Sequence, residues 1–122
     1  MIKVKRIDHV AIATAGLAAV ENRLLDLFGL RPSVHEHVAP QKTDAAFLHA
    51  DDGAAVELIA PAGNESLAKF VDKRGTALHH ICFEVENLAE ALATLKAAGV
   101  PLVDEVPRRG ARNHWVAFIH PK

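Results

Sequence analysis

The sequence has few cysteines, no long apolar run and little net charge, and so lacks the features that mark secreted, membrane and nucleic-acid-binding proteins. Its single cysteine, Cys82, cannot form a disulfide within the chain. No apolar run approaches the roughly 20 residues that cross a bilayer, and charged residues lie among Met1 to Lys5, where a signal peptide would become apolar. The formal net charge is only −1. We therefore expect a cytoplasmic protein with neither a membrane nor a nucleic-acid partner.

The 122 residues that are present fit one domain, residues 1–122, with a core of its own. Half of them are hydrophobic, which excludes a disordered chain. The composition is unusual in its eight histidines, beside no tyrosine and one tryptophan. Most histidines in proteins are ordinary surface or hydrogen-bonded residues, so their number alone does not establish a metal site.

The chain repeats itself. Residues 7–13 and 78–84 are both short strand-like runs with histidine in the third position, His9 and His80, at an offset of 71 residues. The same offset relates residues 47–49 to residues 118–120, and Gly29 lies 70 residues before Gly99. We interpret residues 1–62 and 76–122 as two copies of one unit, joined by a short helix within residues 63–75.

Each copy has the pattern of a strand, a helix and then further strands, so the fold class is α+β. The first helix carries apolar residues at the spacing of one helical face, namely Leu17, Val20, Leu24 and Leu27. The helix of the second copy begins after Asn87. The short helix that joins the two copies spans about 65–73. Further strands are predicted at 33–37, 45–50, 55–60, 102–106 and 114–120. A last strand equivalent to 55–60 would begin near position 126, which is beyond Lys122, so we expect the second copy to lack it.

Strand alternation predicts which side chains converge. His9, Glu57 and His80 all fall on the face opposite the apolar positions of their strands, such as Val10, Leu58 and Ile81. Two imidazoles and a carboxylate suit Co²⁺, Ni²⁺, Mn²⁺ or Zn²⁺. A single strand histidine is more often structural than a ligand, but two at equivalent places in a repeat would meet near a pseudo-twofold axis. Asp8 and His79, which precede them, are expected to pair with each other on the opposite face as structural residues.

At these segments the chain resembles methylmalonyl-CoA epimerase, a family of the vicinal oxygen chelate superfamily that also holds glyoxalase I and the extradiol dioxygenases. The resemblance lies in residues 7–13, 56–61, 78–81, 84–87 and 116–122, and in the linker 66–75. It extends nearly end to end. The strand motifs mark the superfamily, and the linker together with the ending at residues 120–122 narrows it to the epimerases.

The resemblance implies paired βαβββ modules around a divalent metal. His9, Glu57 and His80 match three of its four ligands, and the fourth, a glutamate, would fall at position 128, six residues beyond Lys122. It also implies proton transfer at carbon 2 of an acyl-CoA, for which Glu57 is the catalytic carboxylate that this sequence supplies. A glutamate base that some epimerases carry aligns with Ala45, where Asp44 is a nearby carboxylate that could replace it.

Three functions remain open at this point. The first is an epimerase; the second is a glyoxalase I-type lactoylglutathione lyase, which shares the His–Glu–His set. The third is a non-catalytic protein of the same fold that binds a small molecule, favoured by Ala45 and by the absent fourth ligand. The substrate would be an acyl-CoA thioester or a glutathione adduct. Because the sheet edge next to the missing strand would be unpaired, we also expect a homodimer.

Overall fold

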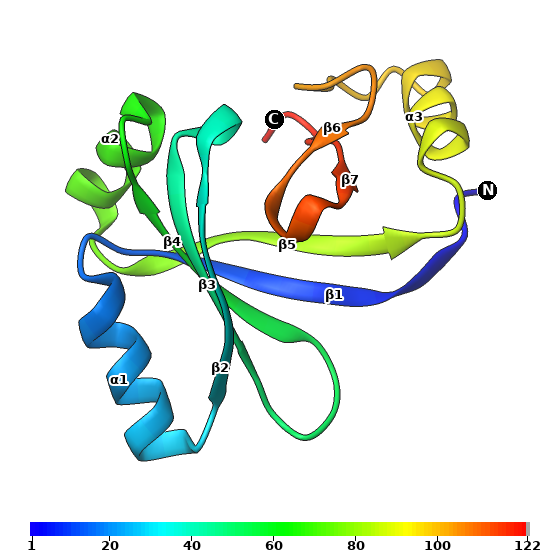
Figure 1. Ribbon diagram of the computed structural model, residues 1–122. Helices are drawn as coiled ribbons and strands as arrows, with labels where there is room; N and C mark the ends of the chain where they lie inside the picture. The colour runs from blue at the N-terminus through cyan, green and yellow to red at the C-terminus, as the bar shows by residue number, and fades with distance from the viewer. Residues whose placement is uncertain (122) are drawn as a thin grey trace.

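The computed structural model describes residues 1–121 (Figure 1). The first copy forms one strand, one helix and three strands, which are β1 (Val4–Ala13), α1 (Leu17–Phe28), β2 (Arg31–Val38), β3 (Thr43–His49) and β4 (Ala55–Pro61). The linker helix α2 (Glu65–Arg74) follows, and the second copy begins with β5 (Ala77–Val85) and α3 (Leu88–Ala97). Two short strands, β6 (Arg108–Arg109) and β7 (Trp115–Val116), lie near the end. Single 3₁₀ turns occupy Ala39–Gln41 and Ala111–Asn113.

The main sheet has five strands in the order β2-β3-β4-β1-β5. β1 pairs in parallel with β4 and antiparallel with β5, and the remaining pairs are antiparallel. β1 and β5, the first strands of the two predicted copies, therefore lie side by side and join the two segments in one mixed sheet. This confirms the predicted α+β class.

Helix α1 covers one face of the sheet (Figure 1). Leu17, Val20 and Leu24 pack against the fully buried Leu58 of β4, as their spacing predicts. Gly29 ends the helix in the left-handed conformation, with φ of 69°. The predicted stripe is wrong at its last position, because Leu27 is 71% exposed.

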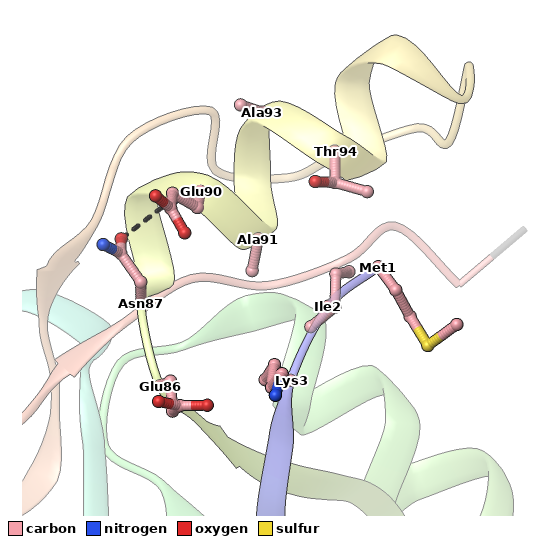
Figure 2. Close-up of a pocket in the computed structure, with 9 residues that line it drawn as sticks. All are labelled: Met1, Ile2, Lys3, Glu86, Asn87, Glu90, Ala91, Ala93 and Thr94. Atoms are coloured by element: carbon pink, nitrogen blue, oxygen red, sulfur yellow. Dashed lines mark hydrogen bonds between the residues drawn. The ribbon is translucent and has the colours of Figure 1, made fainter.

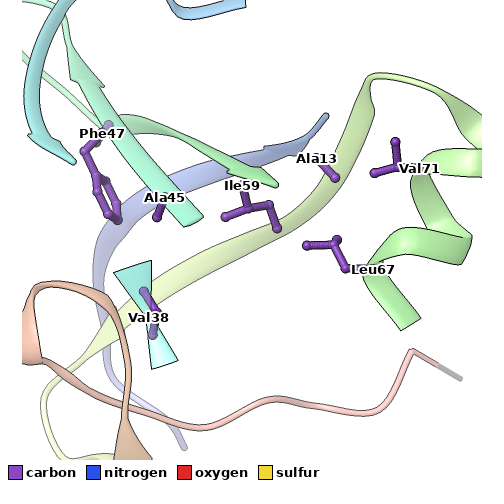
Figure 3. Packing of buried hydrophobic residues seen from close by; sticks show 8 residues of the cluster. Ala13, Val38, Ala45, Phe47, Ile59, Leu67 and Val71 are labelled. Carbon is purple, nitrogen blue, oxygen red and sulfur yellow. The ribbon is translucent and has the colours of Figure 1, made fainter. Parts of the chain in front are cut away.

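Helix α2 and the C-terminal segment lie over the other face (Figure 1). Leu67 and Val71 of α2 pack on Ala13, Ile59 and other buried residues of the sheet (Figure 3). Asn64 begins this helix, since its side-chain oxygen accepts a hydrogen bond from the backbone N–H of Leu67 at 2.9 Å. The predicted linker helix is thus confirmed, and it closes one end of the face that carries the site.

The second copy departs from the predicted strands at 102–106 and 114–120. Within residues 1–121, the two segments share a single bridge, Leu102 to Ile119, and the second adds only the two residues of β7. Pro101 and Pro107 flank the first segment and have no N–H to donate. The backbone N–H groups of Val103 and Asp104 both donate to the carbonyl of Phe118, and the Asp104 side chain accepts the N–H of Phe118 at 2.9 Å, so no regular ladder extends from this point.

Strand alternation places Ile81 on the apolar face of β5, but neither Ile81 nor Phe83 is buried there. These side chains are 49% and 55% exposed, because α3 lies beyond the far end of β5, next to the N-terminus (Figure 1). An apolar strip of β5 is therefore open to solvent. None of the helices formed by residues 1–121 combines the length and apolar character needed to span a bilayer.

Candidate metal site

His9, Glu57 and His80 come together on three adjacent strands, β1, β4 and β5. Ala11 of β1 is the register partner of Glu57 on one side and of His80 on the other. His9 lies two residues before Ala11 on the same face. The small side chain of Ala11 leaves the space above it to the three longer ones, so the predicted convergence is present in the structure.

The donor atoms have the spacing that one ion requires. Oε1 of Glu57 lies 3.1 Å from Nε2 of His9 and 3.8 Å from Nε2 of His80, and one donor atom from each residue lies within 4.8 Å of the others. Ligands held about 2.1 Å from an ion are themselves about 3.0 to 3.4 Å apart at octahedral or tetrahedral angles. The three residues therefore fit a divalent ion after small side-chain movements.

The site is enclosed by apolar and aromatic side chains. His9 and Glu57 are only 8% and 6% exposed. The ring of Phe47 meets that of His9 edge-on at 5.6 Å, and Phe118 meets His80 at 5.5 Å. This surrounding lowers the local dielectric constant and strengthens the attraction between a cation and the carboxylate.

The two histidines differ in protonation. Burial alone would lower the pKa of His9, but hydrogen bonds to Glu57 and Asp8 and the charges of these carboxylates raise it above its ordinary value. Burial lowers the pKa of His80 to about 4, and the charge of Glu57 opposes this only in part. His80 is thus neutral and able to bind a metal at neutral pH, whereas a proton competes with the metal for His9 more strongly than it would for a free imidazole.

A second group with ligand atoms, formed by Asp8, His9 and Cys82, is chemically less suited to an ion. Burial, together with the charges of Asp8 and Glu57, raises the pKa of the Cys82 thiol to about 11, so the thiolate that metals prefer does not form at neutral pH. Asp8 already accepts hydrogen bonds from His9 and Arg112. Within residues 1–121, no fourth ligand joins the His9, Glu57 and His80 set.

The predicted Asp8–His79 pair is wrong. Oδ2 of Asp8 lies 2.8 Å from Nδ1 of His9, and Nδ1 of His79 lies 2.8 Å from Nδ1 of His80. Each residue contacts the histidine that follows it instead of its counterpart in the other copy. The cause is an irregular register between β1 and β5, which strict strand alternation does not anticipate.

The carboxylates near Ala45 also differ from expectation. Ala45 is buried with Phe47 on the side of the sheet that carries the site. Asp44 lies on the opposite side and binds Nδ1 of His37 at 2.8 Å, so its predicted role as a replacement base is wrong. Glu36, the register partner of Ala45 on β2, lies on the site's side between Val34 and Val38. The alternation of Val34, Glu36 and Val38 with polar residues in the sequence could have indicated that Glu36 lies on this side of the sheet.

A groove of about 690 Å³ between the N-terminus and α3 does not contain these ligands (Figure 2). Met1, Ile2 and Lys3 form one wall, and Glu86, Asn87 and Glu90 begin the other. The charged side chains of this groove are exposed to solvent. Asn87 caps α3, since its side-chain oxygen accepts the backbone N–H of Glu90 at 3.0 Å. The chemistry therefore favours the enclosed His–Glu–His set as the functional site.

Comparison with known proteins places this geometry in a family. The family model described as the glyoxalase/bleomycin resistance protein/dioxygenase superfamily matches residues 8–118, which include all three candidate ligands. The chain belongs to this superfamily. Its fold is that of the vicinal oxygen chelate proteins, as the resemblance predicted, and the chain is a distant homologue of methylmalonyl-CoA epimerases.

Three relatives show the extent of the similarity. Methylmalonyl-CoA epimerase of Dictyostelium discoideum is 32% identical, over 99% of this chain and 74% of its own. Bacillus subtilis YqjC, an uncharacterized protein, is 36% identical over 96% of this chain and 84% of its own. The crystal structure of the Mycobacterium tuberculosis epimerase has a TM-score of 0.91 at 36% identity, covering 97% of this chain and 80% of that one.

Ligand complexes of relatives have also been solved. A methylmalonyl-CoA epimerase in complex with methylmalonyl-CoA and NH₄⁺ superposes with a TM-score of 0.92 at 26% identity, covering 98% of this chain and 87% of its own. Another, from Streptomyces coelicolor, holds 2-nitronate-propionyl-CoA and gives the same TM-score of 0.92. These relatives therefore bind acyl-CoA molecules on this fold.

Proposed function

We propose that this protein is a metal-dependent epimerase that moves the proton at carbon 2 of an acyl-CoA, with a methylmalonyl thioester as its substrate class. The observation that carries the proposal is the set of buried His9 and Glu57 with half-buried His80, whose donor atoms share one small volume. The epimerases with which the chain aligns along nearly its whole length support the choice of reaction.

His9, Glu57 and His80 would hold the ion, which would be Co²⁺, Ni²⁺, Mn²⁺ or Zn²⁺. The bound cation would stabilise the negative charge that develops on the thioester oxygen as the proton leaves. Phe47 and Phe118 flank the two histidines and exclude water from this charge. Glu57, the carboxylate of the set, is proposed as a proton carrier on one side of the substrate carbon.

Epimerisation returns the proton to the opposite side of carbon 2, so a second proton carrier is useful. We assign this role to Glu36, which lies on the same side of the sheet and beside the apolar Ala45. Its Oε1 accepts a hydrogen bond from the backbone N–H of Arg112 at 2.8 Å, which orients the carboxylate. Oε2 takes no part in this bond. Replacing Glu36 with glutamine would then slow exchange at carbon 2 while leaving metal affinity intact.

Cations for the coenzyme A phosphates would come from outside the ligand set. Arg108 and Arg112 already face carboxylates, those of Asp104 and Asp8. Lys73 and Arg74 end helix α2, and we propose these two for the phosphates.

The decisive experiment is incorporation of deuterium at carbon 2 of methylmalonyl-CoA in D₂O, followed by mass spectrometry with the metal-loaded protein. We expect exchange with the wild type, loss of it in Glu57→Gln, and wild-type exchange in His37→Gln, whose histidine is exposed and paired with Asp44. Exchange that proceeds equally in Glu57→Gln would refute the assignment of Glu57. No exchange by the metal-loaded wild type would refute the epimerase proposal.

Two other functions are alternatives to the epimerase. A lactoylglutathione lyase would use the same His–Glu–His set, and would be revealed by turnover of methylglyoxal with glutathione. A non-catalytic binding protein is favoured by Ala45, whose buried methyl group leaves no carboxylate at that position. It would be revealed by tight binding of a small molecule with no bound metal and no exchange.

We also propose that the protein is a homodimer. β5 is an edge of the five-stranded sheet, and it presents the exposed apolar residues Leu78, Ile81 and Phe83, next to Ile7 of β1. Apolar side chains along an exposed strand favour association with another copy. Light scattering should report twice the chain mass of 13.1 kDa, and a monomer would contradict this proposal.

A further inference from the structure

Two of the irregularities in the pairing of β1 with β5 lie directly beside the candidate ligands. Ile7 pairs with Phe83 and His9 pairs with Cys82, so Asp8 is an extra residue on β1. Ala11 pairs with His80 and Ile12 pairs with Leu78, so His79 is an extra residue on β5. Each bulge thus precedes one of the two histidines, at equivalent places in the two copies.

A bulge changes which neighbours can touch. In a regular strand, adjacent side chains point to opposite faces and do not meet. An extra residue breaks this alternation and re-aims the side chains around it. Asp8 therefore reaches Nδ1 of His9, and His79 reaches Nδ1 of His80, both at 2.8 Å. The remaining ring nitrogens, Nε2 of each histidine, face Glu57.

We propose that Asp8 and His79 are positioning residues, which hold the Nδ1 proton of His9 and of His80 and so present both Nε2 lone pairs to one metal ion. The inference rests on the metal site of the proposed function. A neutral imidazole carries its proton on one nitrogen, and a fixed acceptor at Nδ1 decides which one. His79 acts as acceptor through Nδ1, which places its own proton on Nε2.

Each positioning residue is anchored by a different part of the chain. Asp8 also accepts a hydrogen bond from Nη2 of Arg112, whose guanidinium lies over the ring of Phe47, 4.1 Å from its centroid. His79 packs edge-on against Phe70 of α2, with ring centroids 4.9 Å apart. The C-terminal segment and the linker helix thus each hold one side of the site. Because Asp8 is charged and His79 is neutral, the effect of Asp8 should be the larger.

The test is Co²⁺ binding to the full chain after removal of metal, measured by calorimetry, together with the tautomer of each histidine from ¹⁵N–¹H spectra. Outer hydrogen-bond partners of metal ligands typically change affinity 10- to 100-fold. We expect a loss of that size in Asp8→Ala, a smaller loss in His79→Ala, and partial recovery in Asp8→Asn and His79→Gln, which keep an acceptor oxygen. His9 should show the Nδ1–H tautomer once neutral, and lose this preference in Asp8→Ala.

Lys5 provides the matched control, because it is the extra residue at a third irregularity of the same strand pair, between Val4 and Arg6. Lys5→Ala should leave Co²⁺ affinity unchanged, and circular dichroism would verify that every variant is folded. If the wild type binds Co²⁺ but Asp8→Ala and His79→Ala bind equally well with unchanged tautomers, the positioning roles are refuted and the metal site stands. If the wild type binds no Co²⁺, the metal site itself is refuted.

Discussion

Replacing Glu57 with glutamine should separate the metal site from the rest of the fold. The two side chains have nearly the same shape, but glutamine carries no charge. In the structure Glu57 is 6% exposed, and its Oε1 lies 3.1 Å from Nε2 of His9. It is the only anionic member of the three-residue set. The change therefore removes the charge that would attract the ion, without opening a cavity.

The expected effect can be expressed as a thermal shift. A ligand present at 100 times its Kd stabilises the folded state by about 2.7 kcal/mol. For a chain of this length, 1 kcal/mol corresponds to about 4 °C in Tm, which gives a rise of about 10 °C. If Glu57→Gln weakens binding at least about 100-fold, the same metal concentration would stabilise it by at most about 0.4 kcal/mol, or under about 2 °C.

The assay is thermal unfolding by circular dichroism, with protein stripped by chelator and then supplied with Co²⁺. His37→Gln controls for binding to surface histidines, since His37 is exposed and pairs with Asp44 outside the site. It should keep the full rise of the wild type. An equal rise in Glu57→Gln and in the wild type would show that the ion binds elsewhere, and would refute the ligand set.

Four further predictions concern the protonation of the two histidines, the core and a helix cap. Because the pKa of His9 is raised, metal affinity should fall as the pH decreases through that pKa. Below it, each bound ion should release about one proton, which calorimetry in buffers of different ionisation enthalpy would measure. His80 stays neutral in the metal-free fold down to about pH 4, whereas an unfolded chain protonates it below about pH 6.5, so the fold loses stability as the pH falls from 6.5 towards 4. His80→Gln should reduce this loss by up to about 3 kcal/mol in the free energy of unfolding measured with urea. Leu58→Ala should cost about 2–5 kcal/mol in the same assay, since Leu58 is fully buried under α1, whereas Asn64→Ala should cost about 1 kcal/mol through loss of the α2 cap.

The first copy was largely predictable because its patterns are local. Apolar spacing identified α1, and strand alternation placed Leu58 on the apolar face that α1 covers. The segments predicted as strands at 45–50 and 55–60 match β3 and β4 closely. The convergence of His9 and His80 followed from the repeat, since equivalent residues in paired copies meet across the shared strands. These properties depend on side chains a few residues apart, which a sequence displays directly.

The second copy was less predictable because its pairing is not local. Residues 102–106 have strand-like composition, but Pro101 and Pro107 limit the backbone donors available there. The segment is instead held by two backbone bonds to the carbonyl of Phe118 and by the Asp104 side chain, which accepts the N–H of Phe118. Such a side-chain bond between residues far from a regular ladder leaves no periodic signal, so composition alone predicted a strand where a single bridge forms.

The contacts of Asp8 and His79 mark a different limit of sequence reasoning. Strict alternation sends both residues away from the site, and a single extra residue in each strand reverses that result. The residue types of β1 and β5 do not predict a bulge, because neither extra residue, Asp8 or His79, is glycine. Yet the two bulges occur at equivalent positions of the repeat, each directly before a ligand histidine. A distortion that recurs at the same place in both copies is better explained by a requirement of the site than by local packing, because the neighbours differ: Arg112 on one side and Phe70 on the other.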